Sequence, residues 1–383
     1  MSSLKAKKVV IVQRRLTHYR VSLFEQLKKS LDENGVELVL LYGKEHSEES
    51  QKKDSANISW AKAVYSAYFF GRKACLMNIS GGAASCDLLI LPQENSLIAN
   101  YLYIFNPYRK NMIAFWGHGA NLQSSNPNGW REKFKKFVLK KVDWWFAYTD
   151  HSANIIKWSG FSDRKITVLN NSIDDKQLRA DLKTLVGEKK YLRDELGLPE
   201  KGHVFLYIGS LYEDKRLDVL IEAVDKIKRT LFDCSLLIVG DGPSKSFILE
   251  AIRKRPWIKW VGARYGLEKA KCLCVADFIL NPGAVGLNVL DSFVSETPIA
   301  TFASAKHGPE FAYLVNRKNA IVVESDLDQY VEAILKALSD NKIYAQLLEG
   351  CRDRANEITL ERMVKRFTFG ILSALEQAGI SDD

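Results

Sequence analysis

Short apolar runs alternate with amphipathic helical patterns along the whole chain, and this alternation restricts the fold more than any other feature. In the first half we expect strands at 8–13, 36–42, 87–91, 112–116, 144–148 and 166–169, with helices at 21–32, 95–104 and 131–141. In the second half we expect strands at 204–208, 235–239, 258–261, 278–280, 299–302 and 320–323, with helices at 216–230, 245–254, 268–276, 287–295 and 327–338. Continuously apolar strands joined through helices are typical of parallel sheets covered on both faces. The pattern predicts an α/β protein with two doubly wound domains.

The two sets of strands are separated by a charged stretch, 174–202, that shows no strand pattern. After residue 339 only helical patterns remain, at 343–357 and 360–377. Doubly wound sheets bind ligands where the carboxyl ends of the strands meet helix N-termini. We therefore expect two domains that face a central cleft.

Composition and charge exclude several classes of protein. Hydrophobic residues make up 46% and charged residues 26% of the 383 residues, so ordinary globular cores can form. No window approaches the ~18 apolar residues of a membrane span. The start of the chain lacks the features of a signal peptide, so we expect a cytoplasmic protein. The formal net charge of +9 favours an anionic partner, whether nucleic acid, anionic lipid or a phosphate-bearing substrate.

Cysteine and histidine spacing does not indicate a metal site. Cys272 and Cys274 are two residues apart, which suits neither a zinc knuckle nor a redox pair, and the six histidines show no i, i+4 spacing. The pair Asp326 and Asp328 opens a helical pattern, where aspartate serves as an N-cap. We expect reduced thiols and no bound metal.

The stretch LNPGAVGLNVLDSFVSETP, residues 280–298, places a loop of small residues between a buried strand and a helix. Bare backbone at the start of a helix can hold an anion on its free N–H groups. A tight strand-to-helix turn that needs glycine explains the same residues without any ligand. The stretch alone leaves both explanations open.

Further glycines in the second half follow predicted strand ends. Gly209-Ser210 ends the first strand, with Lys215 at the start of the next helix, and Gly240-Asp241-Gly242-Pro243 ends the second strand. In order and spacing these motifs, with residues 283–291, resemble the donor domain of the retaining glycosyltransferase family 4, the glycosyl transferases group 1. The resemblance extends over nearly the whole chain and is most specific in the second half.

The resemblance implies the GT-B fold. We expect a Rossmann-like acceptor domain over 1–185 and a Rossmann-like nucleotide-sugar donor domain over 200–360. A C-terminal helix, 361–383, is expected to pack back on the N-terminal domain.

The resemblance also implies a donor site. Lys215 matches the family lysine that meets the donor diphosphate, although a solvated lysine at a helix start is an alternative. Gly286 and Leu287 match the turn that holds phosphate, and Asp291 matches the carboxylate that accepts ribose hydroxyls. Gly209, Gly240, Val285 and Arg264 complete the expected donor site, and Arg264 could equally be an ordinary exposed arginine.

Two positions depart from the family pattern. Ser210 stands where the family usually has arginine, and we expect Arg216 to compensate for the missing cation. Gly283 stands where the family has a glutamate that grips hydroxyls of the donor sugar, which leaves the donor sugar open.

In the first half, His118 lies between two glycines at the end of a predicted strand. The resemblance assigns it to the donor sugar, so that His118 and Lys215 are the expected catalytic residues; a structural histidine is the alternative. His18, Tyr19 and Arg20 follow the first predicted strand, where the family places acceptor contacts.

The segment WREKFKKFVLKKVDWW is the main basic feature of the chain. It interleaves Arg131, Lys133, Lys135, Lys136, Lys140 and Lys141 with apolar residues. Such a helix can lie on an anionic bilayer, or it can be a surface helix with its apolar side on the sheet. Nucleic-acid binding is disfavoured because no recognition module is visible.

These observations predict a retaining, metal-independent hexosyltransferase that uses no cofactor. It would transfer a sugar from a nucleoside-diphosphate sugar to a glycan or lipid-linked acceptor. The expected setting is bacterial surface polysaccharide assembly, such as O-antigen, capsule or exopolysaccharide, at the inner face of the membrane. The alternatives are a GT-B sugar-nucleotide epimerase and a non-catalytic protein that binds sugar nucleotides or nucleic acid.

Overall fold

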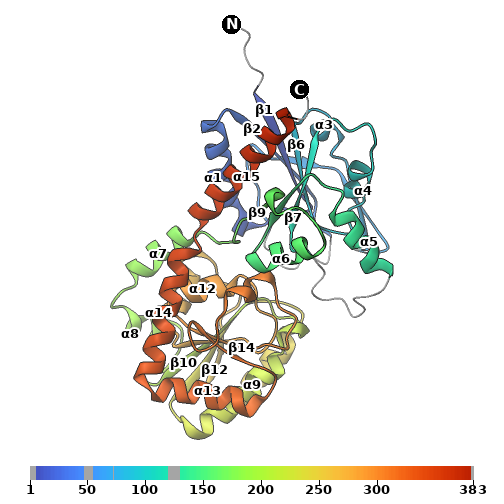
Figure 1. The fold of residues 1–383 in the computed structure, drawn as a ribbon. Coiled ribbons are helices and arrows are strands. Elements are labelled where there is room, and N and C mark those ends of the chain that lie inside the picture. Colours follow the sequence, from blue (N-terminus) through green and yellow to red (C-terminus); the bar gives the residue numbers. More distant parts are fainter. Residues whose placement is uncertain (1–5, 47–54, 72, 120–129, 381–383) are drawn as a thin grey trace. The chain divides into compact units, whose positions relative to one another are not determined.

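In the computed structural model, which describes residues 6–46, 55–71, 73–119 and 130–380, the chain forms two parallel sheets in two separate units. The first unit comprises Met1–Asn171 and Leu360–Asp383, and the second comprises Ser172–Thr359 (Figure 1). Helices cover both sheets. The expected α/β class with two doubly wound domains is confirmed.

The sheet of the first unit has seven strands in the order β3-β2-β1-β6-β7-β8-β9, all paired in parallel. The strands are β1 (Lys7–Gln13), β2 (Val36–Gly43), β3 (Lys62–Val64), β6 (Leu88–Pro92), β7 (Met112–Gly117), β8 (Trp144–Ala147) and β9 (Ile166–Val168). The helices are α1 (Val21–Glu33), α3 (Ser80–Ala83), α4 (Ile98–Ile104), α5 (Trp130–Leu139), α6 (Asp150–Trp158) and α15 (Leu360–Ile380). Two short 3-10 helices, η1 (His18–Arg20) and η2 (Asp163–Lys165), and an antiparallel pair, β4 (Ser66–Phe69) and β5 (Ala74–Met77), complete the unit.

Strand β1 shows why the sheet is buried on both faces. Val9 and Ile11 lie in the apolar cluster that includes α1 and α15, whereas Val10 and Val12 lie in the cluster on the opposite face. All four side chains are fully buried. Side chains alternate between the faces of a strand, so a continuous apolar run needs a helical layer on each side.

The second unit has six parallel strands in the order β12-β11-β10-β13-β14-β15. They are β10 (His203–Ile208), β11 (Cys234–Val239), β12 (Ile258–Trp260), β13 (Phe278–Leu280), β14 (Ile299–Phe302) and β15 (Ala320–Val323). The helices are α7 (Asp175–Thr184), α8 (Lys189–Glu195), α9 (Leu217–Thr230), α10 (Lys245–Lys254), α11 (Gly266–Val275), α12 (Asn288–Val294), α13 (Leu327–Ser339) and α14 (Asn341–Glu357), with 3-10 helices η3 (Glu213–Lys215) and η4 (Pro309–Tyr313).

The boundaries of the two units differ from those expected from the sequence. The segment 174–202 folds into α7 and α8, and Leu178 and Leu192 are buried in the core cluster of the second unit beside α11. The first unit therefore stops at Asn171 instead of residue 185, and the second starts at Ser172 instead of residue 200. Because α7 and α8 contain many charged residues, their few core-facing apolar positions did not give a recognisable helical pattern in the sequence.

The last helix belongs to the first unit, as expected. Phe367 of α15 lies 5.0 Å from the ring of Trp116 and 4.7 Å from that of Phe146, measured between ring centres. These two residues come from β7 and β8, so α15 packs directly on the sheet. The C-terminal helix thus returns to the sheet of the first unit.

Several other features bear on the expectations. The short elements β3, β4, β5 and α3 and the helix α6 were not anticipated. The basic helix, α5, ends at Leu139 instead of residue 141, and the side chains of Arg131, Lys135 and Lys136 lie outside the described part of the chain. All six cysteines are free, and five of them are buried. Across the described residues, no helix has the length and apolar character needed to cross a bilayer.

Candidate functional site

In the second unit, glycines let two loops pack against each other at the carboxyl edge of the sheet. Gly209 follows β10 and Gly240 follows β11, and a side chain at Gly240, where φ is 149°, would overlap the Gly209 carbonyl. Leu211 donates a backbone hydrogen bond of 3.0 Å to Asp241. The glycines therefore bring the loop that leads to Lys215 against the end of β11.

Lys215 joins the start of α9 to the loop after β13. It is the last residue of η3, and Arg216, with φ of 50°, turns the chain into α9. The Lys215 ammonium donates a hydrogen bond to the carbonyl of Ala284. A fixed positive charge therefore lies beside the loop that carries Gly286.

Most backbone N–H groups of this loop already have acceptors. Ala284 donates to the Asp214 carbonyl at 3.0 Å, Val285 donates to Nδ1 of His307 at 3.2 Å, and Gly286 donates to Oδ1 of Asn288 at 3.0 Å. Within the described ranges, no acceptor is recorded for the N–H groups of Leu287 and Asn288, at the start of α12. Those two groups, together with the Lys215 ammonium at Ala284 of the same loop, make this loop compatible with an anion.

Gly283 and Gly286 have different reasons for being glycine. A side chain at Gly283 would collide with the backbone of Asp214 and Lys215, whereas a methyl group at Gly286 would meet nothing within 4 Å. The position at which the family has a glutamate is thus packed against the chain that carries Lys215. Gly286 leaves open space in front of the loop.

Asp291, on α12, is almost completely buried and accepts a hydrogen bond of 2.7 Å from Lys269. Its carboxylate therefore has a fixed partner that leaves one oxygen for another donor. Arg264 is partly exposed, and its Nη1 lies 4.0 Å from Oε2 of Glu268. Its Nε is buried without a hydrogen-bond partner. Within the described residues, the structure shows no hydrogen bond or ion pair between Lys215 and either Arg264 or Asp291.

The backbone of Ser210 and the side chain of Arg216 both make contacts within the second unit. The Ser210 carbonyl accepts a hydrogen bond of 2.8 Å from the Tyr207 hydroxyl. The Arg216 guanidinium lies 5.4 Å from the centre of the Phe302 ring, at the end of β14. Arg216 therefore sits at the carboxyl edge of the sheet, in a cation–π contact.

His307 was not predicted from the sequence, although its side chain accepts a hydrogen bond from Val285 in the loop that carries Gly286. Its Nε2 donates to the Phe302 carbonyl at 2.7 Å, while Nδ1 accepts from Val285. Its ring stacks on Phe311 with centres 3.9 Å apart. Burial lowers the pKa of His307, and the positive charge of Lys215 lowers it further. Its position five residues after a predicted strand was the only available signal.

In the first unit, His118 follows β7 and is held in its neutral form. Its ring lies 4.6 Å from that of Tyr148, and its Nδ1 is buried without a hydrogen-bond partner. Burial lowers the pKa of His118 to about 4, and the charge of Arg20 adds to this effect. At neutral pH the His118 ring is therefore uncharged, and it interacts with its neighbours only as a dipole.

Arg20 lies in the same part of this unit. Its Nη2 donates a hydrogen bond of 2.8 Å to the Tyr148 hydroxyl, and its guanidinium carbon lies 4.3 Å from the centre of the Trp116 ring. A cavity of about 250 Å³ is lined by Arg20, Tyr19 and His118 among others. His18, an exposed residue, is not among the lining residues. The structure therefore brings His118 together with two of the three expected acceptor residues.

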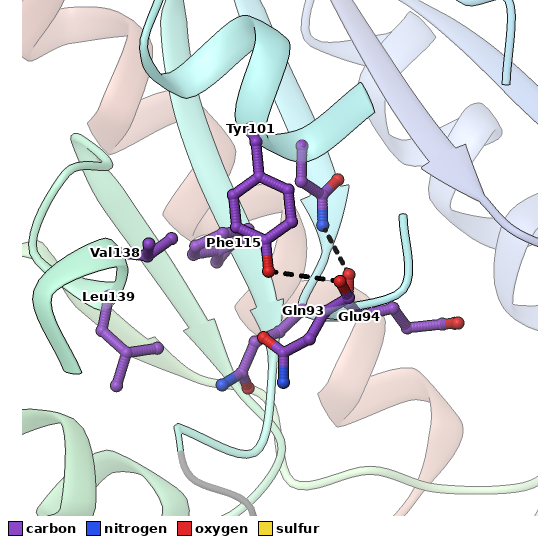
Figure 2. Close-up of a pocket in the computed structure, with 8 residues that line it drawn as sticks. Gln93, Glu94, Tyr101, Phe115, Val138 and Leu139 are labelled. Atoms are coloured by element: carbon purple, nitrogen blue, oxygen red, sulfur yellow. Dashed lines mark hydrogen bonds between the residues drawn. The ribbon is translucent and has the colours of Figure 1, made fainter. Parts of the chain in front are cut away.

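A second cavity in this unit, shown in Figure 2, is of about 10 Å³ and holds at most one water molecule. Tyr101 of α4 points to the loop after β6, and its hydroxyl donates a hydrogen bond of 3.2 Å to the Asn95 carbonyl. Val138 and Leu139 of α5 close the other side. These contacts fix α4 and α5 on the sheet and leave no room for a substrate.

Among the residues that the structure describes, no three histidine, cysteine, aspartate or glutamate side chains group so that they could hold a metal ion.

Comparison with known proteins supports the resemblance. Residues 202–340 match the family model Glycosyl transferases group 1. No curated protein matches the chain in sequence. The first unit lies outside the matched segment.

Solved structures extend the likeness to the whole chain. HepE of Anabaena, solved in complex with UDP, shares 12% identity over 96% of this chain and 100% of that chain, with a TM-score of 0.70. WaaG, a glycosyltransferase involved in lipopolysaccharide biosynthesis, shares 13% over 94% and 98%, with a TM-score of 0.64. Sucrose-phosphate synthase from Thermosynechococcus elongatus shares 14% over 94% and 97%, with a TM-score of 0.67. Residues 202–340 therefore carry the pattern of the glycosyl transferases group 1, and the chain as a whole has the GT-B fold of these glycosyltransferases.

Proposed function

We propose that the protein is a retaining, metal-independent glycosyltransferase of the family 4 type, in the hexosyltransferase class. It takes a sugar from a nucleoside-diphosphate donor and transfers it to an acceptor hydroxyl. The observation that carries this proposal is the hydrogen bond from Lys215 to the Ala284 carbonyl, which holds a positive charge at the loop that leads to the open N–H groups of Leu287 and Asn288.

This arrangement suits a reaction whose leaving group is a diphosphate. Negative charge accumulates on the diphosphate as the bond to the sugar breaks. Groups fixed in advance for that charge supply the largest part of many rate enhancements. The Lys215 ammonium and the two N–H groups are fixed in this way, because the loop is held by Asp214 and His307.

Two further residues have roles in the proposed reaction. Asp291 accepts a ribose hydroxyl on the carboxylate oxygen that Lys269 does not use. His118 contacts the donor sugar as a neutral ring, which agrees with its lowered pKa. Neither role requires a metal ion.

The names of the similar structures guide the choice of donor and setting. HepE was solved with UDP and with UDP-glucose, and WaaG is involved in lipopolysaccharide biosynthesis. We infer a uridine diphosphate sugar as donor and a glycan or lipid-linked acceptor in bacterial surface polysaccharide assembly. The reaction would take place in the cytoplasm at the inner membrane face.

An exposed aromatic and basic surface on α4 and α5 supports a membrane-facing role. Phe134 and Phe137 of α5 are exposed and stack on Tyr101 and Phe105, with ring centres 5.9 and 6.2 Å apart. Among the lysine side chains that the structure describes in and just after α5, Lys133, Lys140 and Lys141 are exposed. Aromatic rings beside lysines match the interface of an anionic bilayer.

The first experiment is a titration of the full-length protein with UDP, GDP and ADP. We expect UDP to bind most tightly. Turnover is then followed with the matching sugar nucleotides, with and without EDTA, and the product's anomeric configuration is assigned by NMR. Binding without transfer or donor hydrolysis would show a non-catalytic binding protein, and a donor returned with altered stereochemistry would show an epimerase.

A further inference from the structure

The cavity of the first unit contains polar groups that this unit itself leaves unsatisfied. Nη1 of Arg20, Nε1 of Trp116 and Nδ1 of His118 are buried and have no hydrogen-bond partner, and all three residues line the cavity. Oγ1 of Thr17, another lining residue, is in the same state. The large majority of buried side-chain polar atoms in proteins have a hydrogen-bond partner, either protein or ordered water, so a cluster of four indicates a missing partner.

The chemistry of these groups defines that partner. Arginine Nη1 and tryptophan Nε1 can only donate a hydrogen bond. A ligand that satisfies both must therefore offer acceptor oxygens. A carboxylate or a phosphate does this, and the planar guanidinium fits either group through two parallel hydrogen bonds.

The charge of the cavity points the same way. Of its three lining arginines, Arg14 pairs with Glu94, and Arg15 lies 3.7 Å from Glu45. Arg20 has no carboxylate partner anywhere in the described part of the chain. Its guanidinium instead lies against aromatic rings, and the guanidinium carbon is 4.3 Å from the centre of the Trp116 ring. A buried charge without a counter-charge is costly, and an anionic ligand offsets that cost.

We propose that the cavity around Arg20 is a subsite for an acidic acceptor sugar, which places a carboxylate or phosphate group against Nη1 of Arg20 and Nε1 of Trp116. The inference rests on the proposed function, because it gives the acceptor a chemical class. The volume of about 250 Å³ is below the ~300–1,000 Å³ of sites for drug-sized ligands, and this size suits a single sugar unit.

The test is a binding experiment on the full-length protein with matched probes. Glucuronate and glucose 6-phosphate carry the two candidate anions, and glucose is their neutral counterpart. Binding is followed through the indole N–H signal of Trp116 in NMR spectra of ¹⁵N-labelled protein, identified with Trp116→Phe. We expect at least one acidic probe to shift that signal and to bind at least tenfold more tightly than glucose. The tighter of the two identifies carboxylate or phosphate as the natural group.

The variants separate this subsite from general effects of charge. Arg20→Gln removes the cation and is expected to weaken the acidic probe at least tenfold. Arg20→Lys keeps a positive charge without the planar guanidinium. Its affinity for the acidic probe should lie between those of the wild type and Arg20→Gln. Arg164→Gln, a change at an exposed arginine of the same unit, should leave probe binding as in the wild type. Thermal unfolding shows whether each variant is folded, and UDP affinity is measured separately.

Several results would overturn the proposal. Equal affinity for glucose and both acidic probes would show that the cavity does not select an anionic group. A loss of UDP affinity in folded Arg20→Gln would assign Arg20 to the donor diphosphate. If the acidic probe binds as expected but the protein shows no transfer with any sugar nucleotide, the proposed function fails while the anion site stands.

Discussion

The backbone N–H of Val285 donates a hydrogen bond of 3.2 Å to Nδ1 of His307. The other ring nitrogen of His307 donates to the carbonyl of Phe302, at the end of β14. One neutral imidazole therefore ties the loop after β13 to the neighbouring strand. This tether fixes the loop that carries Gly286, on which the proposed donor site depends.

His307→Leu should lower the free energy of unfolding by ~1–3 kcal/mol, because the Val285 N–H is left without its acceptor. Urea unfolding at pH 7.5 measures the change. The control is His151→Leu, which alters an exposed histidine and should shift stability by less than ~0.5 kcal/mol. Equal effects of the two variants would show that the tether contributes nothing.

The same tether predicts a dependence on pH. The pKa of His307 is lower in the folded protein than its ordinary value of 6.5, so the unfolded chain binds more protons in that range. The stability of the wild type should therefore fall as the pH drops below about 6.5. The difference from His307→Leu should shrink over the same interval, since protonated Nδ1 cannot accept a hydrogen bond. A difference that stays constant from pH 7.5 to pH 5 would contradict this account.

Gly283 and Gly286 form a matched pair for a test of the loop. Gly283→Ala places a methyl group into the backbone of Asp214 and Lys215, and overpacking of this kind costs ~1–3 kcal/mol. Gly286→Ala meets open space, so it should fold with nearly unchanged stability. We expect Gly286→Ala to weaken UDP binding nevertheless, because the methyl group occupies the space in front of the loop. Thermal unfolding and calorimetric titration together separate the two effects.

Lys215→Ala should weaken UDP binding and lower turnover together. The loss of one charge-assisted hydrogen bond costs ~1.5–3 kcal/mol, which corresponds to a dissociation constant roughly 10- to 100-fold larger. Lys254→Ala, a change at an exposed lysine, is the control. A dissociation constant for UDP that does not change in Lys215→Ala would exclude this residue from the donor site.

The short apolar strands were the part of the fold that could be predicted best from the sequence. β13, β14 and β15 have the expected bounds, because each is a short, mostly apolar run between polar or turn-forming residues and is too short for a helix. The helices α7 and α8 were missed for the opposite reason. More than half of their positions are charged, and only a few leucines, such as Leu178 and Leu192, face the core.

The candidate site was only partly predictable. Lys215 and His118 could be singled out because each follows a recognisable strand end. His307 gave no such signal, since its role depends on a bend that returns the chain to Val285. Gly283 could be identified as a departure from the family pattern, but the reason for it is a close approach of residues 214 and 215, almost 70 positions earlier in the chain.

His118→Ala should lower turnover far more than it weakens the binding of free UDP, because His118 is assigned to the sugar and not to the nucleotide. Its pKa of about 4 adds a second expectation. The ring stays neutral down to about pH 5, so any loss of turnover between pH 7 and pH 5.5 must come from another group and should persist in His118→Gln. A collapse of UDP affinity in His118→Ala, with turnover at saturation retained, would show that the residue has been placed wrongly.

The aromatic and basic surface of α4 and α5 predicts salt-sensitive binding to anionic vesicles. Each lysine near such a surface adds ~1 kcal/mol, so the triple change of Lys133, Lys140 and Lys141 to glutamate should remove most of the affinity. Co-sedimentation with vesicles that contain phosphatidylglycerol measures it, and vesicles of phosphatidylcholine alone give the neutral reference.

A charge-matched control separates this surface from net charge. Changing Lys190, Lys201 and Lys254, which are exposed in the second unit, to glutamate alters the formal charge of the protein by the same amount. The control should still bind anionic vesicles far better than the α5 variant does. Both variants should retain UDP affinity, because none of the six lysines lies at the proposed donor site. If the two variants lose vesicle binding equally, the attraction comes from the overall charge of +9 and not from a surface on α4 and α5.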